Sequence, residues 1–281
     1  MKNLIISCDD LGISKEINSG IKDCLSKGVA SSSSIIANGK FYEHALNEVV
    51  AQTPIKFYGL HLNLTEGHAL SNISNNIICD QNNKFNISAK KYFLLSFIKS
   101  NKKLEKYVYE EFKSQIQKVL KDGMKISHFD SHEHIHHSPW IFKIITVLGK
   151  EFNINKIRFV NEKIILKNYL NNAYDKIKNL NYLKHFIINI CNKKIINPFI
   201  SPDYFFGILN SNRINLDEFL IYLNHLNHAK TFELCIHPGN QSESVKGNEN
   251  RVIEKNLLLS DKFKNFIENK KINLINFSDI T

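Results

Sequence analysis

The densest group of potentially reactive side chains in this sequence is a run of histidines. Five of the twelve histidines fall within residues 128–137, where the sequence reads HFDSHEHIHH. Imidazole is the commonest metal ligand in proteins, and histidine together with carboxylate suits divalent cations. The run lacks the HExxH spacing of a zinc-protease helix. We interpret it as a strand end that passes into a metal-site loop, with a purely structural cluster as the alternative.

Two adjacent carboxylates, Asp9 and Asp10, close a short apolar run near the start of the chain. Residues 4–8 are typical of a buried strand, so the two acids stand at its end. Side chains alternate along a strand, and we therefore expect the two carboxylates to point differently. One would then bind a metal while the other stays available as a base. An acidic turn or a helix N-cap is the alternative interpretation.

Two further histidines stand in strand-like surroundings far from the run. His61 shares one face of a predicted strand with Asn63, between alternating leucines. Taken alone, His61 is more typical of a satisfied core histidine than of a ligand. His237 ends another apolar strand and is followed by a Pro-Gly pair, whose abrupt exit leaves the imidazole at the sheet edge. It is a candidate ligand or general acid.

Together these residues form the inventory for metal-assisted hydrolysis. An Asp/His/His set binds a cation, which polarises a carbonyl and lowers the pKa of a bound water. A separate carboxylate takes the proton of that water, and a histidine protonates the leaving amine. The negative charge that develops on the tetrahedral oxygen is stabilised by the metal and by nearby donors.

The elements that must position these residues alternate between strands and helices. Each polar cluster lies at or just after the end of a predicted strand, and in parallel α/β folds the strand C-termini converge on one functional face. The pattern predicts an α/β fold with a parallel sheet or barrel, as a single domain over residues 1–281. The predicted strands are 4–8, 30–36, 55–64, 126–130, 157–160, 231–236 and 272–275, and the predicted helices lie between Ser14 and Gly28 and at 41–52, 89–122, 140–152, 215–228 and 254–267, with a loop at 71–88.

Residues 163–200 are unusually basic, with seven lysines against one acid, Asp175. We interpret this segment as a helical insertion that forms a lid or wall, with its apolar side on the barrel and its lysines solvated. The alternative is an amphipathic helix whose cationic face lies on an anionic membrane surface.

Composition describes an ordinary globular chain with an excess of positive charge. Hydrophobic residues make up 43% and charged residues 23% of the 281 residues, and the formal net charge is +10. The excess, mostly lysine, either favours an anionic partner or reflects an AT-rich genome; we expect no nucleic-acid partner. Five cysteines without a CxxC pair, no signal peptide and no apolar run of membrane-spanning length predict a cytoplasmic protein.

Six separate motifs follow one another along the chain. They are SCDDLGIS at 7–14, NSGI at 18–21, GVASS at 28–32, GLHLNLTEG at 59–67, HFDSHEHIH at 128–136 and ELCIHPG at 233–239. In this order they resemble the YdjC-like carbohydrate deacetylases, a family that includes chitooligosaccharide deacetylases, from about residue 3 to residue 260. Cys8 and Leu11 replace the family's usual Ala and Phe, which affects pocket shape rather than chemistry. The basic segment 163–200 has no good match and leaves the substrate's identity open.

The resemblance implies a deformed (β/α) TIM-like barrel and a metal-dependent hydrolase that removes an N-acetyl group from an amino sugar or oligosaccharide. It implies Asp9 as the base and His237 as the acid or the histidine on the carbonyl side. It also implies Asp10, His61 and His132 as metal ligands. Mg²⁺ is the metal commonly described for the family, whereas two histidines and an aspartate would suit Zn²⁺. A homodimer follows from the same analogy.

Three more residues are expected near the substrate, namely Asp130, His136 and Arg158. Two other functions remain open at this stage. The lysine excess would suit a phosphoesterase, although a two-metal site needs more bridging carboxylates than the sequence offers. A non-catalytic sugar- or metal-binding protein of the same fold is the other alternative. A spare Asp9 beside Asp10 argues against it, because binding needs only the ligands.

Overall fold

A parallel sheet organises the chain in a computed structural model, which describes residues 2–71, 77–98, 101–165, 180–211, 213–242 and 248–281. The strands follow the order β4-β3-β2-β1-β6-β5, β7 also pairs with β1, and every one of these pairings is parallel. The strands are β1 (Asn3–Leu11), β2 (Ser32–Ile35), β3 (Phe57–Leu62), β4 (Lys125–Ser131), β5 (Tyr204–Phe206), β6 (Thr231–Ile236) and β7 (Asn273–Leu274).

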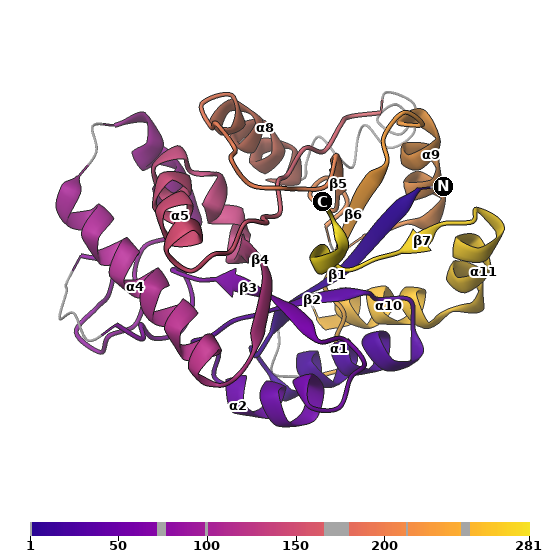
Figure 1. The fold of residues 1–281 in the computed structure, drawn as a ribbon, viewed down its shortest axis with the longest axis horizontal. Coiled ribbons are helices and arrows are strands. Elements are labelled where there is room, and N and C mark those ends of the chain that lie inside the picture. Colours follow the sequence, from indigo (N-terminus) through magenta and orange to yellow (C-terminus); the bar gives the residue numbers. More distant parts are fainter. Residues whose placement is uncertain (1, 72–76, 99–100, 166–179, 212, 243–247) are drawn as a thin grey trace.

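Helices surround the sheet on its outer side (Figure 1). The α-helices are α1 (Lys15–Lys27), α2 (Tyr42–Ala45), α3 (Ala89–Leu94), α4 (Lys102–Lys121), α5 (Pro139–Glu151), α8 (Leu180–Asn192), α9 (Leu216–His225), α10 (Asn248–Leu259) and α11 (Asp261–Asn269). A π-helical turn spans Leu46–Val50, and 3₁₀ turns span Leu95–Phe97, His132–His137 and Phe277–Asp279. Over the part of the chain that the structure describes, none of the helices has the length and apolar character needed to cross a membrane.

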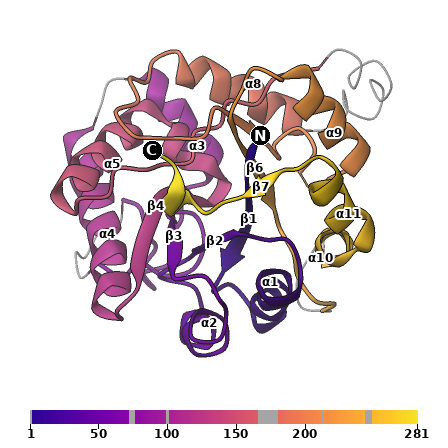
Figure 2. The same cartoon turned by 45° about the vertical axis from the view of Figure 1, so that its right-hand side comes forward.

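The two edges of the sheet are joined through residues 155–161, which pair on both sides without forming a regular strand; we call this segment the seam. On the β4 side, the Phe129 N–H donates to the carbonyl of Lys156 at 3.0 Å. On the β5 side, the Ile157 N–H donates to the carbonyl of Ile200 at 3.0 Å. Figure 2 shows the strands curving around a common centre with helices outside. The predicted α/β fold is confirmed, and the pairing through the seam agrees with a deformed barrel.

Local sequence explains where several elements begin and end. Strands covered by helices read as continuous apolar runs, and β1 is buried from Leu4 to its end. α1 begins after Ser14, whose Oγ accepts the N–H of Ile17 at 3.1 Å, and it ends at Gly28, as predicted. Ser260 caps the start of α11 in the same way.

Some predicted elements differ from the structure. The predicted strand 157–160 is the irregular seam. The predicted helix 41–52 divides into α2 and the π-helical turn, and the predicted helix 254–267 divides into α10 and α11, because Ser260 starts a new helix. β5 has no predicted counterpart, since three residues carry too little periodic signal. Within the predicted insertion 163–200, α8 is helical and residues 166–179 lie outside the described residues.

Strand register brings the predicted polar clusters to one edge of the sheet. β1 and β6 pair in register along their lengths, so that Asp9 and His237 follow as neighbours at the strand ends. β3 and β4 pair so that His61 stands directly opposite Asp130, and His132 follows just after β4. The parallel sheet thus gathers residues from four distant parts of the sequence, as the pattern of strand-end polar residues predicts.

Candidate active site

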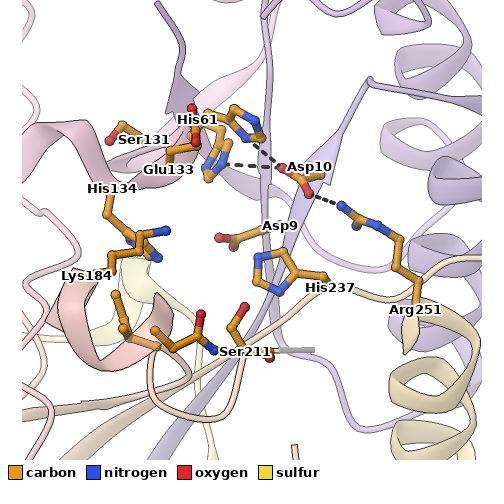
Figure 3. A pocket seen from close by; sticks show the side chains of 13 residues that line it. Asp9, Asp10, His61, Ser131, Glu133, His134, Lys184, Ser211, His237 and Arg251 are labelled. Atoms are coloured by element: carbon orange, nitrogen blue, oxygen red, sulfur yellow. Dashed lines mark hydrogen bonds and ion pairs between the residues drawn. The ribbon is translucent and has the colours of Figure 1, made fainter. Parts of the chain in front are cut away.

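A pocket of about 180 Å³ opens at these strand ends. All five predicted metal-ligand and catalytic residues line it, namely Asp9, Asp10, His61, His132 and His237. Figure 3 shows His134 and Lys184 entering from one side and Arg251 from the opposite side. Residues that are separate in the sequence therefore share one small polar cavity.

Asp10 is the centre of an Asp/His/His cluster. Its Oδ1 lies 3.0 Å from His132 Nδ1 and 3.7 Å from His61 Nε2. The backbone of Asp10 adopts a left-handed φ of 72°, and the β1–β2 register shifts between Cys8 and Leu11. This irregularity turns both Asp9 and Asp10 towards the pocket, although each contacts a different partner. The alternation expected of a regular strand therefore does not apply, because the strand is bulged at this point.

His61 is held from behind by a buried carboxylate on the neighbouring strand. Its Nδ1 lies 2.9 Å from Asp130 Oδ1, while the Ser34 hydroxyl donates to Asp130 Oδ2 at 2.8 Å. Because the Ser34 hydroxyl donates to Asp130, its oxygen accepts from the Nδ1–H of His61 at 3.1 Å, and the same ring nitrogen is paired with the charge of Asp130. Nε2 then faces Asp10, which is the arrangement of a metal-binding histidine with its supporting acid.

His132 is held by an unusual turn after β4. The next two residues, Glu133 and His134, have φ values of 54° and 58°, a left-handed conformation that is rare outside glycine. The Ser131 hydroxyl braces the turn by accepting the N–H of His136 at 3.0 Å. His132 Nε2, on the side away from Asp10, lies 3.6 Å from the carboxylate of Glu66.

The charges around the cluster shift its titration strongly. Burial alone would lower the pKa of His132, but its contacts with Asp10 and Glu66 raise it to about 10. Burial alone would raise the pKa of Asp10, whereas Arg251 and His132 hold it well below its usual range. Burial lowers and Asp130 raises the pKa of His61, and the net shift is upward. Metal ligation requires neutral imidazoles, so a cation bound by Asp10 and the two histidines would release any proton that these rings hold.

Asp9 is held by a buried guanidinium. Arg158 donates from its two terminal nitrogens to the two oxygens of Asp9 at 2.5 and 2.8 Å. Arg158 is itself fixed by Glu233, at 2.8 Å from Nε, and by Asp130, at 2.9 Å. Burial would raise the pKa of Asp9, but Arg158 lowers it, so the carboxylate stays ionised. Burial raises the pKa of Glu233 to about 7.

The imidazole of His237 lies beside Asp9 (Figure 3). Its Nδ1 is buried and has no hydrogen-bond partner among the described residues, while its backbone N–H donates to Glu254 Oε2 at 2.7 Å. Burial lowers the pKa of His237 to about 4, against the opposing effect of Asp10 and Asp9. At neutral pH the ring is therefore neutral, with one N–H to donate and one lone pair to accept.

Two positively charged side chains of the pocket, those of Arg251 and Lys184, are not marked as site residues by any pattern in the sequence. Arg251, from α10, donates to Asp10 Oδ2 at 2.5 Å, which leaves Oδ1 facing the two histidines. Lys184, from α8, extends into the pocket, and burial lowers its pKa. Helices have no fixed register with strand ends, so the local sequence around these residues does not mark them.

The three residues predicted near the substrate lie directly beneath the pocket, and their role towards a substrate stays a prediction. Asp130, His136 and Arg158 are fully buried and do not line it. Asp130 supports His61, and Arg158 holds Asp9. His136 bridges the Ser131 hydroxyl at 2.6 Å and the carbonyl of Arg158 at 3.1 Å. In the structure, these three residues position others.

Most of the histidine run has a packing role. Within the described residues, His132 is the one member of the run that joins an Asp/His/His cluster. His128 stacks on Phe277 with ring centroids 3.5 Å apart, and His137 pairs through Nδ1 with Asn192 of α8 at 2.6 Å. Burial lowers the pKa of both to about 3, so they are neutral. The structural interpretation therefore applies to most of the run.

The fold and the pocket define a class, that of parallel α/β proteins with carboxylates and histidines gathered at the strand ends. The sequence profile of the family described as YdjC-like protein matches residues 3–269, and the chain belongs to this family. The resemblance seen in the sequence motifs is thereby confirmed.

Relatives with assigned names are similar over the whole chain. A carbohydrate deacetylase of Clostridium beijerinckii is 28% identical over 287 residues, which cover 99% of each chain. One of Brevibacillus brevis is 24% identical over 281 residues, again 99% of each. Carbohydrate deacetylase 1 of Listeria innocua is 32% identical over 152 residues, 54% of this chain and 59% of that protein.

A solved structure supports the fold independently. A protein of Enterococcus faecalis V583, named as a cellobiose-phosphate cleavage protein, superposes with a TM-score of 0.74. The alignment covers 98% of this chain and 97% of the other at 20% sequence identity. The architecture is therefore shared along the entire length.

Proposed function

We propose that this chain is a metal-dependent hydrolase that removes N-acetyl groups from an amino sugar or oligosaccharide. The observation that carries the proposal is the presence, in one pocket, of an Asp/His/His cluster and a separate ionised carboxylate, Asp9, held by Arg158. The full-length similarity to proteins named carbohydrate deacetylases supports the substrate class.

The donor atoms of Asp10, His61 and His132 fit a small divalent cation. Ligand bonds near 2.1 Å put neighbouring donors roughly 3.0–3.4 Å apart in octahedral or tetrahedral geometry. Of the separations from Asp10 Oδ1, that to His132, at 3.0 Å, lies within this range, and that to His61, at 3.7 Å, lies a few tenths of an ångström above it. Each histidine also has a carboxylate at its far nitrogen, as metal-binding histidines generally do.

Asp9 is suited to accept a proton from an attacking water. A cation bound by the cluster would polarise the acetyl carbonyl and lower the pKa of that water. Asp9 accepts from Arg158 at both oxygens and from the Cys235 thiol at Oδ2, which leaves a free lone pair on Oδ1, and its lowered pKa keeps it ionised. Arg158 is fixed by Glu233, so Asp9 is oriented before the substrate arrives.

His237 is suited to deliver a proton to the leaving amine. The ring lines the pocket beside Asp9, and at neutral pH it is neutral in this structure. A neutral imidazole donates from one nitrogen and accepts at the other, so His237 can relay the proton that Asp9 receives. The hydrogen bond from its backbone to Glu254 fixes the turn that presents the ring.

Mg²⁺ is the proposed cofactor, on the family resemblance, and Zn²⁺ is the alternative. Two imidazole nitrogens and one carboxylate are a Zn²⁺-type donor set, whereas Mg²⁺ prefers oxygen ligands. Calorimetric titration of the chelator-treated protein with each ion decides between them. A homodimer and a cytoplasmic location remain predictions.

The alternative functions differ in what the site would need. A two-metal phosphoesterase needs bridging carboxylates, and Asp9, the carboxylate next to Asp10, is engaged by Arg158. A non-catalytic binding protein needs only the three ligands, so an oriented Asp9 would have no purpose in it. The site therefore favours amide hydrolysis over both.

Acetate release from a panel of N-acetylated mono- and oligosaccharides tests the proposal. We expect release with added divalent metal, loss of release with chelator and recovery on adding metal back. Sugar phosphates assayed for phosphate release serve as the matched comparison. Phosphate release without acetate release would replace the proposal with a phosphoesterase, and release of neither with metal bound would favour the binding protein.

A further inference from the structure

The helix α8 has two apolar faces, of which one is buried. His185, Ile188 and Cys191 pack into the molecule. On the outer side, the side chains of Leu183 and Phe186 are 54% and 60% exposed. A surface helix normally covers its outer face with polar residues, so this face is unpartnered in the described structure.

The neighbouring segment α3 and its following 3₁₀ turn continue this apolar surface. Phe93 of α3 belongs to the same buried cluster as Ile188 and Cys191 of α8, and Lys194, just after α8, contacts the ring of Phe97, so the two segments approach each other. The next residues turn outward. We define the apolar rim as the exposed residues of both segments, Leu94, Phe97, Ile98, Leu180, Leu183 and Phe186.

Exposed lysines lie close in sequence to the apolar rim, in α3, at the start of α4 and just after α8. Seven exposed lysines lie within 89–98, 101–106 and 193–194, namely Lys90, Lys91, Lys102, Lys103, Lys106, Lys193 and Lys194, against one acid, Glu105, which leaves a charge of +6. The Lys194 ammonium lies 4.3 Å from the ring centroid of Phe97. An exposed ammonium group therefore contacts an apolar side chain of the rim, and the other exposed lysines lie close to the rim residues in sequence.

We propose that the apolar rim and its lysines bind the surface of an anionic lipid bilayer. Apolar side chains would enter the boundary between headgroups and acyl chains, while lysines extend to the anionic headgroups. A second copy of the chain fits less well, because a two-fold contact would place one cationic rim against another. The proposal does not depend on the hydrolytic function.

The surface and the pocket share a helix. Asn181 and Lys184 of α8 line the pocket, while Leu183 and Phe186 of the same helix belong to the apolar rim. A bilayer bound at the rim would therefore lie next to the pocket, and a substrate carried on a lipid would reach it without leaving the membrane surface.

Co-sedimentation of the full chain with vesicles tests the proposal. We expect binding to phosphatidylcholine vesicles that contain phosphatidylglycerol, weaker binding at higher salt, and little binding to phosphatidylcholine alone. The double variants Leu183→Ser/Phe186→Ser and Lys193→Glu/Lys194→Glu should each weaken partitioning at least about tenfold. The matched control, Ile253→Ser/Lys270→Glu, changes an exposed apolar residue and an exposed lysine elsewhere and should bind as the unmodified chain does.

A fluorescence measurement keeps the test independent of folding losses. In the variant Phe186→Trp, anionic vesicles should shift the tryptophan emission to shorter wavelength, and Ile253→Trp should show no shift. Absence of sedimentation at low salt would overturn the proposal, as would equal losses in the control variant. Self-association in light scattering that Leu183→Ser/Phe186→Ser abolishes, without vesicle binding, would assign the rim to a second copy instead.

Discussion

The two histidines of the Asp/His/His cluster are supported in opposite surroundings. His61 is backed by Asp130, a fully buried carboxylate on the adjacent strand, at 2.9 Å. His132 is backed by Glu66, whose side chain is 61% exposed in the loop after β3, at 3.6 Å. In each case a carboxylate stands at the imidazole nitrogen that faces away from Asp10.

The two histidines therefore differ in how they are supported, one by a carboxylate held by strand pairing and the other by a carboxylate in a loop. The Asp130–His61 contact follows from the β3–β4 register and is shielded from solvent, so its geometry is fixed. The Glu66–His132 contact is screened by water and salt, and exposed ion pairs of this kind contribute little. We infer that the buried side determines whether the site forms, while the exposed side adjusts its affinity.

The largest expected effect concerns Asp9, which Arg158 connects to Asp130, the buried carboxylate that supports His61. The variant Asp9→Asn should keep its metal but lose at least about 10²-fold in turnover, because a general base is removed. Metal content by atomic emission and acetate release measure the two quantities separately. Asp23→Asn, at a surface ion pair with Lys27, is the control and should retain activity. Near-normal turnover in Asp9→Asn with metal bound would remove the base from Asp9.

The second prediction concerns the proton donor, His237, separately from the two supporting carboxylates, Asp130 and Glu66. The variant His237→Ala should leave metal affinity unchanged and lower the rate on N-acetylated sugars by about 10²-fold. On activated acetyl esters the loss should be much smaller, because their leaving group needs no proton. The ratio of the two losses is the measurement. Equal losses would instead indicate that His237 supports the metal or positions the substrate.

Neutralising Asp130 and Glu66 in turn tests whether the buried carboxylate supports metal binding more strongly than the exposed one. Asp130→Asn should weaken metal affinity by about 10- to 100-fold, the usual effect of removing a supporting acid. Glu66→Gln should weaken it by less than about threefold, as expected for an exposed pair. Calorimetric titration measures both, at low and moderate salt, and salt should reduce the Glu66 effect.

Two matched variants control for general effects of these substitutions. Glu111→Gln neutralises a fully buried carboxylate that binds the Leu70 and Ser71 amides away from the pocket, and it should lower stability without changing metal affinity. Glu43→Gln neutralises an exposed partner of Lys118 and should change neither. Equal losses of metal affinity in Asp130→Asn and Glu66→Gln would contradict the inferred difference between the two sides.

The smallest effect is the pH dependence of stability in the metal-free protein. The pKa of His132 rises on folding from 6.5 to about 10, so its contribution is fully present below about pH 6.5 and is lost as pH rises to about 10. The difference in unfolding free energy between the parent and His132→Gln should shrink over this window by more than about 1.4 kcal/mol, the value of one pKa unit. Urea unfolding at a series of pH values measures it.

Saturating metal provides the control for this prediction, because a bound cation replaces the proton on His132. The pH dependence specific to His132 should then disappear. A difference between parent and variant that stays constant with pH, without metal, would show that Asp10 and Glu66 do not hold the extra proton.

The sequence predicts the strand-end part of the site well. Asp9, Asp10 and His237 each close or follow an apolar run, whereas His61 lies within one and is marked as a ligand by the family resemblance; parallel strands bring such residues together by register. Their placement in one pocket therefore follows from local pattern and a general property of the fold.

The rest of the site depends on packing between residues that are distant in sequence, which the local sequence pattern does not predict. Arg251 reaches Asp10 from α10, a helix with no register to the sheet. Arg158 is fully buried against Asp9, a residue that is distant in sequence, so the residues around Arg158 do not predict its burial. His128 and His137 have the same residue type as His132, and only their neighbours in space distinguish packing from ligation.

Local opening of the seam limits how long the site stays in its active arrangement, independently of the unfolding of the whole protein. β1 and β6 are joined through six residue pairs in register, whereas the seam is attached by the isolated bridges Phe129–Ile157 and Lys156–Ile200. Segments with so few backbone contacts open at a lower free energy than the core strands. Each opening would draw Arg158 away from Asp9 and leave buried carboxylates without a counter-charge. The rate at which amide hydrogens of residues 155–161 exchange with solvent therefore reports how often the seam opens, and so how long the pocket keeps its active arrangement.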